Sequence, residues 1–392
     1  MSSHALLSPS GASRWLACTP SARLEQQFPD NAGDAAREGT LAHSLGELFI
    51  NWQLNRISKK DFSKAYDTLM ESPFYDNSMK EYVDNYMAFV LETFAAAQAH
   101  TVDAQMFLEQ KLDLTAYVPE GFGTGDVVII ADGYLDLIDL KFGKGVPVSS
   151  ENNKQMMLYA LGAVEKFGDL YDIQTVTMTI YQPRIDNISS WSIPLIELLG
   201  WAEAELKPRA ALAFTGGGDY APGPQCRFCR AKAVCRANAD YNLDVLKYDF
   251  KAPDLLEDAE IADVLGKVDS ITKWVAAIEA HALNEAVNKG KKWPGYKLVE
   301  GRSNRQLTDP AAVAKKLIAY EWSEAVIYEP KKLLGITALE KLLTKKVFEN
   351  TLGGFVVKPP GKPALVPASD KRTEYSSAAN AVHDFADVDI DE

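Results

Sequence analysis

The sequence predicts an α/β protein in which helices flank a mixed β-sheet core, followed by a mainly helical C-terminal module. Three observations lead to this prediction. Short segments rich in β-branched and apolar residues recur between positions 104 and 194, and a helical pattern separates the third of them from the fourth. Beyond position 254, helical periodicity dominates. With 392 residues, 47% of them hydrophobic, the chain can bury a large core.

The region before the first strand is predicted to be helical. Residues 1–30 read as a short helical lead-in, and longer helices are expected over Arg37–Arg56 and over residues 76–99. Thr40 is the expected N-cap of the first long helix. Its apolar residues recur at helical spacing, namely Leu41, Leu45, Leu48, Phe49 and Trp52.

The sheet is predicted from five segments with strand composition and one intervening helix. Residues 149–168 have capping serines and apolar positions that would pack on a sheet, so a helix is expected there. The expected strands cover Ala104–Leu114, Asp126–Asp132, Tyr134–Lys141, Ile173–Arg184 and Ile188–Pro194. The strands and this intervening helix together predict a mixed α/β core.

Charge and hydropathy narrow the possible environments and partners. The chain has no apolar run of about 18 residues and no basic segment followed by an apolar one at its start, so we expect neither a membrane span nor a signal peptide. A cytoplasmic location is therefore expected. The net charge of −13 argues against binding nucleic acid by bulk electrostatics, so any such contact needs a local basic patch or bound cations.

One predicted hairpin, GDVVIIADGYLDLIDLKFG over Gly125–Gly143, carries unusual charges. The Asp-Gly pair at positions 132 and 133 is a strong tight-turn signal, which places Asp126 beside the far end of the second strand. Asp139 and Lys141, two residues apart, share one face of that strand, whereas Asp136 points to the other face. Two carboxylates and one ammonium group are therefore expected to converge.

Convergent carboxylates repel each other unless a cation lies between them, and hard oxygen ligands favour Mg²⁺ or Mn²⁺. A neighbouring lysine can orient a water molecule or stabilise charge that develops on a phosphate. This combination suits phosphodiester hydrolysis. The alternative is an ordinary salt bridge at the edge of a sheet.

Four motifs of the sequence resemble those of the PD-(D/E)XK nuclease superfamily, in particular its RecB-like branch. They are a histidine on an early helix, a G-x-x-D motif, a D-x-K motif and a Q-x-x-x-Y helix. They occur in the family's order and correspond to His43, Asp126, Asp139 with Lys141, and Gln155 with Tyr159. The resemblance covers about residues 10–240 and implies a restriction-endonuclease-like fold.

The resemblance also implies roles for individual residues. His43, Asp126, Asp139 and the backbone carbonyl of Leu140 would hold the metal, and Lys141 would be catalytic. The side chains of Gln155 and Tyr159, one helical turn apart, would position the site and the DNA strand. Glu109 occupies the place of a further acid that many relatives have on the preceding strand, although an exposed strand glutamate is the commoner explanation. Glu47, one turn after His43, is either a partner of that histidine or a solvated residue.

The four cysteines form a second pattern, Cys18 followed by Cys226-x2-Cys229-x5-Cys235. In a reducing compartment such clustering suggests a metal site, and the spacing alone leaves open Zn²⁺, an iron-sulfur cluster or unliganded thiols. Some RecB-like nucleases, including the AddB helicase-nuclease subunit and the CRISPR adaptation nucleases, have one cysteine before the nuclease motifs and three after them. This resemblance implies a structural 4Fe-4S cluster that joins the two ends of the nuclease domain.

Four basic residues lie among the clustered cysteines. Arg227, Arg230, Lys232 and Arg236 could supply the local basic patch that an acidic protein needs to hold DNA. They could equally form the solvated face of a short helix.

Three regions are predicted: a nuclease-like domain over residues 1–240, a mainly helical accessory module over residues 241–355, and a disordered acidic tail over residues 356–392. The tail resembles in composition the tails by which single-stranded DNA-binding proteins recruit partners, so a single-stranded DNA-binding or recombination protein is a candidate partner. A solubilising role is the simpler interpretation.

The function expected from these features is a metal-dependent DNA nuclease that acts on DNA ends or single strands. The whole chain resembles a group of phage and prophage proteins, which suggests DNA replication, recombination or repair in the cytoplasm of a bacterial host. One alternative is a non-catalytic nucleic-acid-binding or assembly protein that uses the nuclease fold as a scaffold. Another is a regulatory protein in which the cysteines form a zinc module.

Overall fold

A computed structural model of the full chain describes residues 5–29, 33–145, 147–248, 256–299, 309–321, 323–324, 335–343 and 345–356. Nearly all of the predicted acidic tail, residues 357–392, lies outside these ranges. The described part confirms the predicted α/β class, with a five-stranded mixed sheet, flanking helices and a helical C-terminal part.

The sheet has the strand order β1-β2-β3-β4-β5. All neighbours are antiparallel except β3 and β4, which are parallel because α6 connects them as a crossover. The β2–β3 hairpin turns at Gly133, whose φ of +90° suits glycine. The strands are β1 (Gln105–Asp113), β2 (Phe122–Ala131), β3 (Gly133–Leu140), β4 (Ile173–Gln182) and β5 (Asn187–Pro194).

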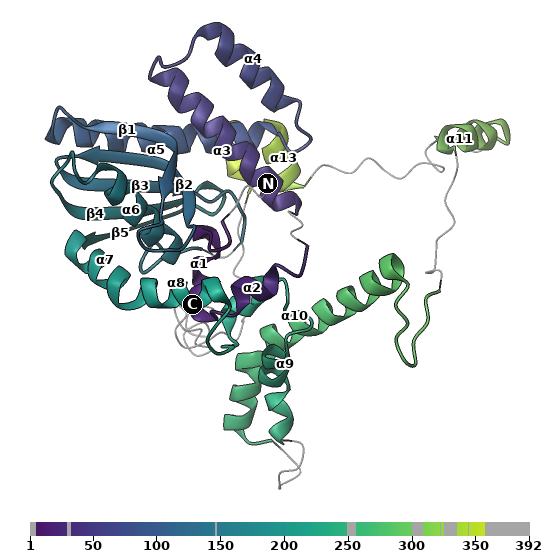
Figure 1. Cartoon of the computed structure of the whole chain (residues 1–392). Helices are drawn as coiled ribbons and strands as arrows, with labels where there is room; N and C mark the ends of the chain where they lie inside the picture. The colour runs from purple at the N-terminus through teal and green to yellow at the C-terminus, as the bar shows by residue number, and fades with distance from the viewer. Residues whose placement is uncertain are drawn as a thin grey trace, which may run out of the picture.

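Helices cover both faces of the sheet (Figure 1). One face packs against α3 (Asp34–Gln53) and α5 (Asn77–His100), and its core includes Val127, Ile129 and Ile138. The other face packs against α6 (Lys154–Phe167), α1 (Ala12–Ala17), α7 (Leu195–Trp201) and α8 (Lys207–Thr215). The alternation of β2 and β3 residues between two cores explains why their sequences read as nearly continuous apolar runs.

The helix predicted over Arg37–Arg56 exists, but its expected start was wrong. It begins at Asp34, with Gly33 at the N-cap, and the hydroxyl of Thr40 donates a hydrogen bond to the Ala36 carbonyl inside the helix. A further helix that we did not predict, α4 (Lys59–Met70), follows it and has no buried residue. Its N-cap Ser58 accepts a hydrogen bond from the Asp61 amide, as a capping serine should.

The two ends of the predicted nuclease-like region lie side by side (Figure 1). Long-range hydrogen bonds join α1, α2 (Ser21–Glu25) and the turns after them to the segment that follows β5. Arg209 donates to the carbonyl of Leu16, and Arg23 donates to the carbonyl of Phe214. Thr19 donates to the Gly217 carbonyl, which completes the attachment.

The C-terminal part is helical, as predicted. Helix α10 (Asp258–Lys289) packs on α9 (Arg236–Leu243), and α11 covers Pro310–Ala319. The last two helices, α13 (Ile336–Leu343) and α14 (Lys345–Leu352), return to the first region, where the Lys346 amide donates to Glu81 of α5. No helix within the described ranges has the length and apolar character needed to cross a membrane.

Candidate functional site

The charged residues of the β2–β3 hairpin meet at one end of the sheet. Val127 of β2 pairs with Ile138 of β3, so the next residues outward, Asp126 and Asp139, lie opposite each other. Asp126 Oδ2 accepts a hydrogen bond of 2.7 Å from the amide of Leu140, which is buried. The structure therefore brings the two acids together as the alternation of strand residues predicted.

Lys141 lies beside Asp139. Its ammonium Nζ is 2.9 Å from Asp139 Oδ2, a carboxylate oxygen that is buried and has no hydrogen-bond partner of good geometry in the described part of the chain. Asp139 as a whole is only 2% exposed. The ammonium of Lys141 compensates the charge of this buried carboxylate, and the oxygen that lacks a hydrogen bond is consistent with a further cation, as at a metal ligand.

Helix α6 places two more of the predicted residues on this pair. Asn153 caps the helix by accepting hydrogen bonds from the amides of Gln155 and Met156. From this first turn, Gln155 donates to Asp139 Oδ1 over 3.1 Å, accepts from Lys141 Nζ over 2.9 Å and donates to the Tyr159 hydroxyl over 3.1 Å. Its amide therefore fixes the relative positions of the acid and the lysine.

His43 approaches the same end of the sheet from α3. Its Nδ1 is 3.2 Å from Asp126 Oδ2 and 3.9 Å from Glu109 Oε1. Ligand atoms of His43, Glu109 and Asp126 all lie within 4.8 Å of one another, so these three side chains could hold one metal ion. Two carboxylates and an imidazole are a donor set that suits Mn²⁺ and, through the oxygens, Mg²⁺.

Glu109 reaches this group through an irregularity in β1. Leu108 pairs with Val127 and Gln110 pairs with Gly125, so the register is unbroken and Glu109 lies opposite Asp126 of β2. Its φ of +43° is in the left-handed region, which is unfavourable for a glutamate. The Glu109 carboxylate lies 3.9 Å from His43 Nδ1, and strained backbone of this kind clusters at functional sites. The structure thus gives Glu109 a more central place than an exposed strand glutamate would have.

The electrostatics of the group are strongly coupled. Burial alone would lower the pKa of His43, but the charges of Asp126, Asp139 and Glu109 and the hydrogen bond to Asp126 outweigh it and raise the pKa to about 9. Burial, followed by the charge of Asp126, raises the pKa of Glu109 to about 7. Without a metal ion, the imidazole is therefore protonated at neutral pH and supplies the positive charge that a metal would otherwise supply.

The Asp139–Lys141 pair behaves differently. Burial raises the pKa of Asp139. Burial alone would lower the pKa of Lys141, but the charges of Asp139 and Asp126 and the hydrogen bond to Asp139 raise it above its ordinary value. Lys141 is thus a permanent ammonium group here, suited to stabilising negative charge rather than to accepting a proton.

Tyr86 belongs to the site although no sequence motif indicated it. It lies on α5 with 3% of its surface exposed and lines one small cavity together with His43, Glu47, Glu109 and Asp126. Burial and the charges of Asp126, Asp139 and Glu109 raise its pKa, so the phenol stays protonated and can act only as a neutral hydrogen-bonding group toward the acids. In the sequence it is indistinguishable from a core residue at helical spacing. Glu47 lines the cavity too, which favours its interpretation as a partner of the site.

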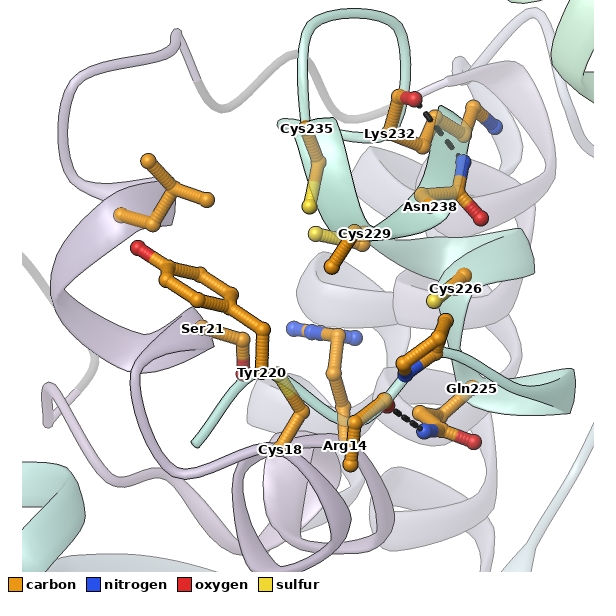
Figure 2. A pocket seen from close by; sticks show the side chains of 14 residues that line it. Arg14, Cys18, Ser21, Tyr220, Gln225, Cys226, Cys229, Lys232, Cys235 and Asn238 are labelled. Carbon is orange, nitrogen blue, oxygen red and sulfur yellow. Dashed lines mark hydrogen bonds between the residues drawn. The ribbon is translucent and has the colours of Figure 1, made fainter. Parts of the chain in front are cut away.

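The four cysteines line one recess between the N-terminal helices and the segment before α9 (Figure 2). All four are free thiols, and the Arg14 side chain extends among them. Burial raises the pKa of Cys229 to about 12 and also raises that of Cys226. No three sulfur atoms in the described chain lie within 4.8 Å of one another. A tetrahedral zinc site would hold them about 3.8 Å apart, so this arrangement is wider than a closed zinc site.

The basic residues around the cysteines do not form one free patch. Arg230 uses its amide to donate to Glu25 and its guanidinium to donate to the Phe28 carbonyl. The ammonium of Lys232 donates to the carbonyl of Arg227. Arg227 and Arg236 are exposed, so these two remain the candidates for contacting a polyanion.

Comparisons with known proteins identify the family of the chain. It belongs to the family described as "Protein of unknown function (DUF2800)", whose model matches residues 4–373. Among solved structures, one titled "Crystal structure of SSO0001" aligns with 56% of this chain and 95% of its own at 12% sequence identity. The TM-score of that alignment is 0.22, which carries no argument about fold or function.

Proposed function

We propose that the protein is a Mg²⁺- or Mn²⁺-dependent DNA nuclease that hydrolyses phosphodiester bonds. It acts on DNA ends or single strands, as an exonuclease does. The observation that carries the proposal is that two carboxylates and an imidazole lie within 4.8 Å of one another at the end of the sheet where Lys141 pairs with the buried Asp139. The order of the four sequence motifs on the same elements adds to this support.

Each residue has a role that follows from its position. The cation would be held by His43, Glu109 and Asp126, together with Asp139 and the Leu140 carbonyl. When bound, it would polarise the phosphate and activate a water molecule. The ammonium of Lys141 would stabilise the charge that develops on the phosphate oxygens. Gln155 would hold Lys141 against Asp139, and its third hydrogen bond would orient Tyr159.

The cysteine recess would hold a 4Fe-4S cluster with a structural role. Four thiols without disulfides that line one recess support this proposal. In the protein they stand where the N-terminal helices meet the segment before α9, so a cluster would reinforce contacts that hydrogen bonds already make.

We also propose DNA as the substrate and the cytoplasm of a bacterial host as the location, with a role in phage DNA replication, recombination or repair. A protein with a net charge of −13 must attract DNA locally. The bound cation, Lys141 and the exposed Arg227 and Arg236 are the groups available for that. Recruitment of a single-stranded DNA-binding or recombination protein through the acidic tail remains a proposal about residues outside the described ranges.

The decisive experiment is a cleavage assay on end-labelled single-stranded and duplex DNA with Mg²⁺, Mn²⁺ or EDTA. Asp139→Asn should lower the cleavage rate by at least about 100-fold, because it removes a ligand charge that the transition state needs. Asp136→Asn is the matched control. Asp136 lies on the same strand but faces the opposite side, near Thr177, and its variant should cleave like the wild type.

The main alternative is a non-catalytic DNA-binding or assembly protein built on the same fold. Wild-type protein that folds and binds DNA, yet shows no metal-dependent cleavage of either substrate, would establish that alternative. Equal cleavage by Asp139→Asn and wild type would refute the proposed site, even if cleavage itself were present.

A further inference from the structure

Arg184 is a buried cation close to the proposed site that none of the preceding roles uses. It lies in the turn Pro183–Ile185 directly after β4, and its side chain is only 8% exposed. Its Nη1 is 2.8 Å from Glu38 Oε2 and donates to the Phe142 carbonyl over 3.5 Å. The guanidinium also lies over the ring of Phe142, 4.8 Å from its centroid. A buried arginine is costly, so these contacts require a reason.

The two partners of Arg184, Glu38 and Phe142, lie on the two segments that carry His43 and Lys141. Glu38 is on α3, five residues before His43. Phe142 directly follows Lys141, at the end of β3. Because β3 and β4 are parallel, their carboxyl ends meet at one edge of the sheet, which places the turn after β4 beside both. One guanidinium therefore connects the helix that carries the imidazole to the strand that carries the lysine.

The rest of the attachment of α3 is mostly apolar. Leu41, Leu45 and Phe49 pack in the core against α5 and the sheet, and such packing is non-directional. A polar contact joins the helix to the sheet near each end: Glu38 with Arg184 at the start, and Arg56, just after the helix, with the Met106 carbonyl of β1. Of these two polar contacts, the one between Arg184 and Glu38 is nearer to His43.

We propose that Arg184 is a positioning residue of the metal site, which holds α3 so that the imidazole of His43 stays in reach of Asp126 and Glu109. This inference rests on the proposed metal-binding function. The planar guanidinium is necessary because it contacts a carboxylate, a carbonyl and an aromatic ring together. A lysine at this position keeps the charge but offers a single point donor without the flat face.

The test is isothermal titration of the full chain with Mn²⁺, with folding monitored by circular dichroism. Arg184→Lys should weaken Mn²⁺ binding about tenfold, the effect expected when a group that orients a metal ligand is lost. Arg56→Lys is the matched control, since it alters the same kind of contact at the far end of α3, and it should bind Mn²⁺ like the wild type. If Arg184→Lys does not fold, Glu38→Gln provides the same test from the more exposed partner.

Repeating the titration in a His43→Ala variant distinguishes a positioning role of Arg184 from a general destabilisation of the fold. In His43→Ala protein, Mn²⁺ binding is weaker, and adding Arg184→Lys should weaken it no further, because the residue acts through His43. An equal tenfold loss in both backgrounds would overturn the proposal, as would unchanged binding by Arg184→Lys in the wild type. Wild-type protein that binds no Mn²⁺ would refute the proposed function and this inference together, whereas normal binding by both wild type and Arg184→Lys refutes the inference alone.

Discussion

If the protein binds a metal ion as proposed, the protonation of His43 makes that binding depend on pH in a way that can be calculated. A metal ion binds the neutral imidazole and the ionised carboxylate, so each proton on these groups competes with it. The pKa of His43 is about 9, and that of Glu109 is about 7. Mn²⁺ affinity should therefore rise as the pH rises from 7 to 9.

The size of the effect follows from these two values. At pH 7 about 1% of His43 is neutral, and at pH 9 about half is, which gives a factor of about 50. About half of Glu109 is ionised at pH 7 and nearly all at pH 9, which adds a factor of about two. Together they predict a gain of about 100-fold, or about 3 kcal/mol of binding free energy.

The assay is anaerobic titration calorimetry with Mn²⁺ at intervals between pH 6.5 and 9.5, in two buffers that differ in ionisation enthalpy. At pH 7, about 1.5 protons should be released for each ion bound. His43→Asn, which cannot titrate, should bind more weakly at pH 9 and should gain clearly less affinity than the wild type between pH 7 and 9. A profile of His43→Asn parallel to that of the wild type would refute the reasoning.

Three further predictions concern stability and the cysteines. Since the pKa of His43 rises from 6.5 to about 9 on folding, metal-free protein should be most stable below pH 6.5 and should lose up to about 3 kcal/mol as the pH passes through 9, measured by urea unfolding in EDTA. Gly123→Ala places a Cβ 2.8 Å from the Tyr159 ring and should cost about 1–3 kcal/mol in the same assay, whereas Gly125→Ala, with 3.3 Å to its nearest neighbour, should cost less. Protein purified without oxygen should absorb at about 400 nm, and Cys229→Ser should abolish that band; colourless wild type with one zinc per chain would contradict the cluster.

The sequence predicted those parts of the site that rest on local rules. Strand alternation and the Asp-Gly turn placed Asp126 against Asp139, and helical spacing put Gln155 and Tyr159 on one face. These features depend on residues close in the chain, and their geometry follows from regular secondary structure.

The remaining parts depend on tertiary structure. Nothing in the segment FLEQKL signals that Glu109 adopts a positive φ, because this conformation is a property of the folded sheet, where Glu109 lies opposite Asp126. Tyr86 looks like any core aromatic of α5 until the sheet brings the acids beneath it. Arg184 is 146 positions from Glu38, so only the folded chain shows that they pair. Sequence patterns reveal ligands more readily than the groups that position them.

The hydrogen bonds that join the N-terminal helices to the segment after β5 have a consequence for the order of folding. The Glu25 carboxylate pairs with Arg14 and with the amide of Arg230, which is 205 residues away. Closing such a large loop is entropically expensive and slow. During synthesis, α1 and α2 therefore cannot complete these contacts until all five strands of the sheet have been made.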